Sequence, residues 1–202
     1  MIRIVISEDQ GLLRSALVSL LSLEEDLDVV GQAGDGREAL ALIERLRPDV
    51  ALIDIEMPLM SGLDVADALA GREEIGCRLI ILTTFARPGY FQRAMKAGVF
   101  GYLLKDSPAE ELAEAIRSVR NGRRVIHPEL AFAMWEEPCP LTAREREVLS
   151  LAALGHSLQE IGAKLFLSHG TVRNYISEAM GKLGASSRIE AIRKARDKGW
   201  LD

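Results

Sequence analysis

Five short apolar runs, each followed by residues at helical spacing, constrain the fold of the first 122 residues. The runs lie at residues 2–6, around 28–30, and at 50–53, 79–82 and 99–104. They are rich in β-branched residues and too short for buried helices, which predicts strands that are buried on both faces. Strands that alternate with helices predict an α/β fold: a doubly wound, five-stranded parallel sheet of the flavodoxin-like kind with right-handed crossovers.

Polar side chains follow four of these five strands. Glu8 and Asp9 end the first strand, Asp54 the third, Thr83 the fourth and Lys105 the fifth. The carboxyl ends of parallel strands meet at one edge of the sheet, where open α/β sheets bind their ligands. A single aspartate after a strand is equally consistent with a helix cap, so the prediction of a site depends on the convergence of all four strands.

The chemistry of this edge favours a phosphoryl group and a hard cation. Three crowded carboxylates repel one another unless a cation is bound, and Mg²⁺ prefers oxygen ligands. With its charge neutralised, Asp54 could attack a phosphoryl group as a carboxylate nucleophile. Lys105 would then pair with the phosphate, and the hydroxyl of Thr83 would donate a hydrogen bond to it.

An ordered set of these residues resembles the receiver domain of bacterial two-component response regulators. The resemblance covers residues 2–122 and rests on Glu8-Asp9, on Asp54 followed by Met57-Pro58, on Thr83, and on Tyr102 with Lys105. Taken alone, Tyr102 is a core residue and Thr83 a strand former. Their places in the ordered set favour switch roles.

The resemblance implies a role for each residue of the set. Asp54 is the phosphoacceptor for a histidine kinase. Asp9, Asp54 and the main-chain carbonyl of Glu56 hold Mg²⁺, and Thr83 and Tyr102 reorient as the switch.

The chain departs from the family pattern at three positions. Glu8 stands where the family often has Asp, which favours contact with the metal through water. Lys105 is followed by Asp106 rather than proline, so no cis bond is expected there. Thr84 stands where many receivers have a smaller residue, which predicts narrower access for a phosphatase.

Charge divides the 202 residues into two parts. Residues 138–202 contain ten Lys and Arg against seven Asp and Glu, whereas the rest contains 15 against 23. We therefore expect an acidic domain at residues 1–122, a proline-containing linker at 123–139 and a more basic domain at 140–202. The absence of an apolar run of membrane-spanning length or of a signal-peptide pattern predicts a cytoplasmic protein without direct membrane insertion.

The second domain is predicted to be all-α with a helix-turn-helix. Thr142 and Ser157 each precede a glutamate by three residues, a capping-box pattern that predicts two short helices. Ser168 can cap a longer third helix that runs to about residue 183. Two short helices followed by a longer one match the helix-turn-helix plan.

The third helix is predicted to read double-stranded DNA. Val172 and Ile176 share its buried face, which leaves Arg173, Asn174 and Ser177 exposed. Arginine can read guanine and asparagine adenine by paired hydrogen bonds in the major groove. The predicted DNA contacts are Ser168, Thr171, Arg173, Asn174, Tyr175, Ser177, Lys182 and Arg188, with Lys182 and Arg188 on phosphates.

Residues 141–149, 161–165 and 170–176 resemble the LuxR-type DNA-binding domain, and this resemblance covers residues 140–199. Joined to a receiver, such a domain makes a NarL/FixJ-class response regulator. The class implies a cognate histidine kinase, binding to operator DNA, and a homodimer on phosphorylation that uses the first and fifth helices, around residues 14–21 and 112–119. The resemblance implies no enzymatic turnover beyond phosphorylation and dephosphorylation of the receiver itself.

Two other functions remain open at this point. A phosphohydrolase could use Asp54 as nucleophile, but such enzymes typically need a second Asp two residues later, where this chain has Glu56. An orphan regulator would respond to a bound ligand or protein instead of a kinase.

Overall fold

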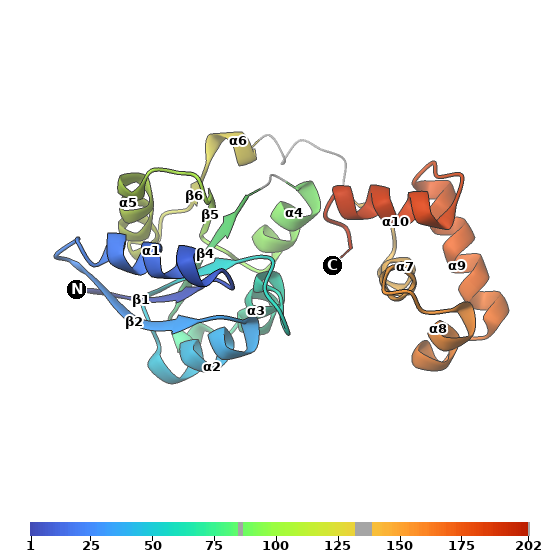
Figure 1. Cartoon of the computed structure of the whole chain (residues 1–202), viewed down its shortest axis with the longest axis horizontal. Coiled ribbons are helices and arrows are strands. Elements are labelled where there is room, and N and C mark those ends of the chain that lie inside the picture. The colour runs from blue at the N-terminus through green and yellow to red at the C-terminus, as the bar shows by residue number, and fades with distance from the viewer. Residues whose placement is uncertain (85–86, 132–138, 202) are drawn as a thin grey trace. The chain divides into compact units, whose positions relative to one another are not determined.

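The computed structural model describes residues 1–84, 87–131 and 139–201 (Figure 1). The chain divides into two compact units, one built around a parallel sheet and one made of helices, and each is described by itself. None of the helices in the described residues combines the length and the apolar character that a bilayer crossing requires.

The sheet unit is doubly wound, as predicted. Its strand order is β2-β1-β3-β4-β5-β6, and every neighbouring pair is parallel. The strands are β1 (Ile2–Ser7), β2 (Leu27–Ala33), β3 (Val50–Asp54), β4 (Arg78–Thr83), β5 (Gly101–Leu104) and β6 (Val125–Ile126). Strand β3 is buried along its whole length, which explains its unbroken apolar sequence.

Helices cover both faces of this sheet (Figure 1). They are α1 (Gly11–Leu21), α2 (Gly36–Leu46), α3 (Gly62–Leu69), α4 (Pro88–Lys96) and α5 (Ala109–Arg120), with a 3₁₀ turn at Glu73–Ile75. Apolar residues of α1 and α5 pack on alternate residues of β1, β3 and β4 to form one core cluster. The alternation follows from the two-residue repeat of a strand.

Local sequence fixes how α2 and α3 begin. Asp35 caps α2 by accepting hydrogen bonds from the backbone N–H groups of Arg37 and Glu38. The Glu38 side chain accepts from the backbone N–H of Gly34 at 2.9 Å rather than from that of Asp35, so the reciprocal bond of a capping box is displaced by one residue. At α3, a Cβ on Gly62 would lie 2.0 Å from the carbonyl oxygen of Asp54, so only glycine fits where the helix begins beside β3.

The predicted count of five strands was wrong by one. Strand β6 lies within the segment predicted as linker and pairs with β5, and His127 N–H donates to the carbonyl oxygen of Tyr102. Two residues are too few to show strand periodicity in a sequence. The sequence around residues 130–135 also predicts a short helix, which overlaps α6 (Pro128–Ala131) at its first two residues. Residues 132–138 lie outside the described residues.

The helical unit contains the three predicted helices and a fourth. They are α7 (Ala143–Ala153), α8 (Leu158–Leu165), α9 (His169–Lys182) and α10 (Arg188–Asp197). The capping boxes at Thr142 and Ser157 are both present, and Ser168 caps α9 by accepting from Thr171 N–H. Val172, Ile176 and Ala179 are buried, which confirms the predicted inner face of α9.

Candidate functional site

Three carboxylates meet at the carboxyl edge of the sheet. Glu8 and Asp54 are buried and Asp9 is exposed, and one oxygen from each lies within 4.8 Å of the others. The Lys105 ammonium reaches the same place from the end of β5. Its Nζ lies 2.8 Å from Oε2 of Glu8 and 2.9 Å from Oδ2 of Asp54. The convergence expected from the strand order is therefore present.

Burial and hydrogen bonding have opposite effects on the pKa values of Glu8 and Lys105 in this cluster. Burial raises the pKa of Glu8, and the charge of Asp54 adds to that rise, although the hydrogen bond from Lys105 opposes it. Burial also disfavours the Lys105 cation, but its hydrogen bonds to Glu8 and Asp54 outweigh that effect and raise the lysine pKa. Lys105 thus compensates two carboxylates at once, and a second cation would relieve the remaining negative charge.

The donor set fits a hard divalent cation. All three side chains offer carboxylate oxygens, the ligand type that Mg²⁺ prefers. The two oxygens of Glu8 are already engaged, one with Lys105 and the other with the backbone N–H of Gln10 at 3.2 Å. The exposed carboxylate of Asp9 and the side chain of Asp54 are therefore the better placed direct ligands.

The other residues predicted for this site lie around the same edge. Thr83 is buried at the end of β4, and its carbonyl oxygen accepts from the Lys105 backbone N–H at 2.9 Å. Thr84 and Glu56 are exposed on the loops that follow β4 and β3. Tyr102 points into the core and is fully buried.

Phe91 was not predicted to belong to this neighbourhood. Its ring in α4 meets that of Tyr102 edge to face, with centroids 5.3 Å apart and an interplanar angle of 88°. An aromatic pair of this geometry adds about 0.5–1.5 kcal/mol beyond area burial. Any movement of Tyr102 must therefore repack α4, and no local sequence pattern signals the pair because the residues lie on different elements.

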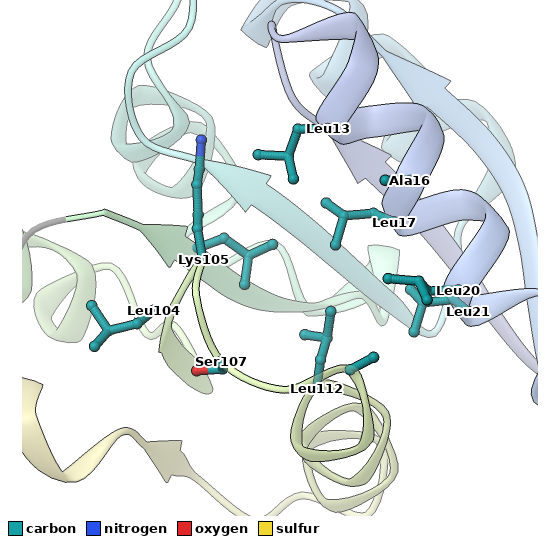
Figure 2. Close-up of a pocket in the computed structure, with 11 residues that line it drawn as sticks. Leu13, Ala16, Leu17, Leu20, Leu21, Leu104, Lys105, Ser107 and Leu112 are labelled. Atoms are coloured by element: carbon teal, nitrogen blue, oxygen red, sulfur yellow. The ribbon is translucent and has the colours of Figure 1, made fainter.

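An apolar groove of about 100 Å³ lies between α1 and the β5–α5 loop. Figure 2 shows Leu13, Leu17 and Leu112 lining it, with the aliphatic stem of Lys105 along one side and its ammonium directed away. Leu20, which also lines the groove, is 45% exposed, and Leu12 on the same helix is 88% exposed. The groove therefore opens to solvent at Leu20, and α1 carries a further exposed leucine at position 12.

Helix α9 presents the predicted polar stripe. Arg173, Asn174 and Ser177 are exposed, and Tyr175 is half-buried. At its amino end, the Ser168 hydroxyl lies 2.8 Å from that of Thr171 and accepts from the Thr171 N–H at 3.1 Å. Arg188 is exposed in the first turn of α10, the helix that the sequence analysis missed.

Lys182 has an intramolecular partner that the sequence analysis did not anticipate. Its Nζ lies 2.7 and 2.8 Å from the two carboxylate oxygens of Glu145, which is 1% exposed. The pair joins the last residue of α9 to the first turn of α7. In the free domain Lys182 is thus engaged in packing, and its predicted phosphate contact stays a prediction.

Comparisons with known proteins agree with this arrangement. Residues 4–117 match the response regulator receiver domain, and residues 139–195 match the bacterial regulatory proteins of the luxR family. The transcriptional regulatory protein DesR of Bacillus subtilis is 55% identical over 201 residues, which cover 100% of both chains.

Solved structures of response regulators are also similar to this chain. The response regulator ChrA of a heme-sensing two-component system is 35% identical, with 99% of this chain and 98% of that chain covered at a TM-score of 0.58. The response regulator RcsB in complex with DNA shares the fold at 23% identity, with a TM-score of 0.65 over 97% of this chain and 98% of that one.

Proposed function

Because the chain belongs to the two-component response regulators that join a receiver domain to a LuxR-type DNA-binding domain, we propose that Asp54 is its phosphoacceptor. The observation that carries this proposal is the buried Asp54 carboxylate at the end of β3, with an oxygen 2.9 Å from Lys105 Nζ. An Asp54 oxygen attacks the phosphorus of a kinase phosphohistidine. A P–O bond forms, the P–N bond breaks, and the imidazole takes up a proton.

Mg²⁺ is the proposed cofactor, held by Asp9, Asp54 and the main-chain carbonyl of Glu56, with Glu8 acting through water. When bound, the ion neutralises charge on the incoming phosphoryl group and on the carboxylates. Lys105 exchanges part of its contact with Asp54 for a phosphate oxygen, and Thr83 donates its hydroxyl to another. Thr84, exposed beside Thr83, is proposed to limit access of a phosphatase to the phosphoryl group.

The proposed switch acts through Tyr102. A change at Thr83 and Lys105 reaches Tyr102 through β4 and β5, which pair directly. Because Phe91 packs on the Tyr102 ring, a new position of that ring changes the surface of α4. Phosphorylation would therefore bias a two-state surface rather than create a new one.

Phosphorylation of Asp54 is tested by intact mass after incubation with acetyl phosphate and Mg²⁺. A gain of one phosphoryl group is expected for the wild type and for Asp106→Asn, a matched control because Asp106 is exposed and directly follows Lys105 in the sequence. No gain is expected for Asp54→Asn. Modification of that variant to the wild-type extent would overturn the assignment, and continuous turnover of a phosphate ester would favour the phosphohydrolase instead.

The proposed result of phosphorylation is a homodimer formed by α1 and α5. The support is the groove between α1 and the β5–α5 loop (Figure 2). Leu12 of the same helix α1 is 88% exposed. Leu12→Glu is expected to keep the phosphoryl mass gain but to sediment as a monomer. Leu23→Glu is the matched control, because Leu23 is equally apolar, 79% exposed and lies beyond the end of α1. Dimerisation of Leu12→Glu at wild-type strength would exclude this interface.

The dimer is proposed to bind operator DNA with the exposed stripe of each α9. Arg173 and Asn174 read bases, Ser168, Thr171, Tyr175 and Ser177 lie along the contact, and Arg188 with Lys182 meets phosphates. Arg173→Ala is expected to cost about 1–3 kcal/mol and to relax sequence preference. Lys164→Ala is the control, because Lys164 is exposed on α8. A uniform loss on all sequences would reassign Arg173 to the phosphate backbone.

The proposed partners place the chain in the cytoplasm, where it meets both a histidine kinase and chromosomal DNA. The 55% identity to the transcriptional regulatory protein DesR over the whole chain supports a role in transcription. As the regulated target we propose membrane-lipid desaturase genes. Retention of a desaturase promoter from fragmented genomic DNA by the phosphorylated chain is the expected result. A retained set without such a promoter would remove this target while leaving the phosphorylation proposal intact.

A further inference from the structure

Phe166 combines two features that are unfavourable in the free helical domain. It ends α8 in the left-handed conformation, with φ 57° and ψ 42°, and its side chain is 96% exposed. A residue with a Cβ is disfavoured in this conformation, which glycine and asparagine adopt more readily. A phenylalanine exposed to water also leaves a large apolar surface unburied.

The backbone around Phe166 is tightly held. Its N–H and that of Leu167 both donate to the carbonyl oxygen of Gly162, the latter at 2.8 Å. Arg144 donates from Nη2 to the carbonyl oxygen of Leu165 at 2.7 Å. The Phe166 side chain is therefore presented to solvent from a fixed turn, so that little backbone ordering would be needed on binding.

Phe166 is close in sequence to the residues proposed to read DNA. It lies two residues before Ser168, the N-cap of α9. Residues 168–170, at the start of this helix, are all exposed. The exposed Arg173 and Asn174 lie one turn further along the same helix. An aromatic side chain at this end of α9 borders the proposed major-groove surface.

We propose that Phe166 is a DNA-contacting residue whose ring packs on the 5-methyl group of a thymine at the edge of the site read by α9. Apolar contact with the thymine methyl group, which cytosine lacks, is a direct means of base discrimination in the major groove. The contact removes from water the ring that the free domain exposes. The inference rests on the proposed use of α9 as the reading helix.

The test replaces Phe166 with glycine, because the substitution affects the backbone and the DNA contact in opposite directions. It should raise the stability of the free domain and lower its affinity for DNA. Glycine relieves the left-handed conformation, so the Phe166→Gly chain is expected to unfold at a higher temperature than the wild type. Its affinity for DNA is expected to fall about tenfold, within the range of a single base contact. The probe is a duplex selected by the full-length wild-type chain from a random-sequence pool.

A second arm identifies the contacted group. The thymines of the selected duplex are replaced one at a time by deoxyuridine, which removes only the 5-methyl group. At one edge position the wild type is expected to lose affinity while Phe166→Gly loses none. Leu154→Ala is the matched control, because Leu154 is also apolar and exposed but lies at the end of α7.

The contradicting outcomes separate this inference from the proposed function. Wild-type affinity of Phe166→Gly together with reduced affinity of Arg173→Ala overturns the role of Phe166 alone. Unchanged affinity in both variants overturns the reading helix as well. If deoxyuridine lowers the DNA affinity of the wild type and of Phe166→Gly equally, the methyl contact is overturned. A Phe166→Gly chain that binds DNA normally but fails in transcription also overturns it and would indicate a protein partner.

Discussion

Replacing Lys182 with methionine should destabilise the helical domain. The substitution keeps the apolar stem and removes the ammonium that meets both oxygens of Glu145. Glu145 would keep the hydrogen bond that the Thr142 N–H donates to Oε2 at 2.7 Å. The carboxylate is 1% exposed, so water cannot replace the lost donor without local opening.

The magnitude follows from the burial of the two partners. Breaking a fully buried ion pair by removing one partner costs about 3–5 kcal/mol, and an unsatisfied buried acceptor about 1–3 kcal/mol. The Lys182 side chain is 38% exposed, so solvent screens the pair and the lower range applies. We expect a loss of about 2 kcal/mol, or on the order of 10 °C in the unfolding midpoint of a domain this small.

The sign of the pH dependence is set by Glu145. Burial alone would raise its pKa, but the hydrogen bonds from Lys182 and Thr142 lower it below the ordinary value. A lowered carboxyl pKa contributes stability above the unfolded value, near 4.3, that is lost as pH falls through the folded value. The difference in stability between wild type and Lys182→Met should therefore close on acidification.

The assay is thermal unfolding of the full chain between neutral and acidic pH, with Lys164→Met as control for an exposed lysine. A double-mutant cycle with Glu145→Gln isolates the pair. If Lys182 serves only as a phosphate contact, stability will be unchanged at every pH and the salt dependence of DNA binding will fall by about one unit instead. That result would refute the packing role.

Three further predictions concern the receiver. Gly62→Ala should abolish its folded state, because the added Cβ would lie 2.0 Å from the Asp54 carbonyl oxygen; a native circular dichroism spectrum would contradict this. Phe91→Ala should cost about 3–5 kcal/mol and broaden the Tyr102 ring signals in NMR spectra, whereas unchanged signals would separate α4 from the switch. Mg²⁺ at about 100 times its dissociation constant should stabilise the receiver by about 2.7 kcal/mol, and an equal shift in Asp9→Asn would exclude Asp9 as a ligand.

The sequence predicted the sheet and its polar edge because topology, not side-chain detail, brings those residues together. Once five strands are parallel, whatever follows each strand must lie on one edge, so Lys105 could be placed at the same edge as Glu8 and Asp54 without coordinates. Its ion pairs with both carboxylates came from the structure, since the sequence paired Lys105 only with a phosphate. The helix caps were equally local. Thr142, Ser157 and Ser168 each act on residues three positions away, within reach of pattern recognition.

The sequence did not predict strand β6 or helix α10, because neither has a clear local pattern of apolar residues. Strand β6 is two residues long and exists only because β5 offers an edge to pair with. Helix α10 is mostly polar, with only Ala191 and Ala195 fully buried, so its apolar stripe is too narrow to predict a helix. Ser187 caps it by accepting from the Glu190 N–H at 3.2 Å, and the serine and glutamate at this spacing were the available signal.

Lys182 shows why exposed-face reasoning on one helix is incomplete. Lys182 lies outside the buried stripe of α9, which Val172, Ile176 and Ala179 form. A lysine at such a position is chemically suited to bind a DNA phosphate. Its partner is 37 residues away on α7, where the Thr142–Glu145 capping box already accounts for the glutamate. Since the Glu145 carboxylate serves both the cap and Lys182, α7 and the end of the reading helix are fixed together. A contact of Lys182 with DNA would have to compete with that shared carboxylate, so phosphate binding at this position would also loosen the packing between α7 and α9.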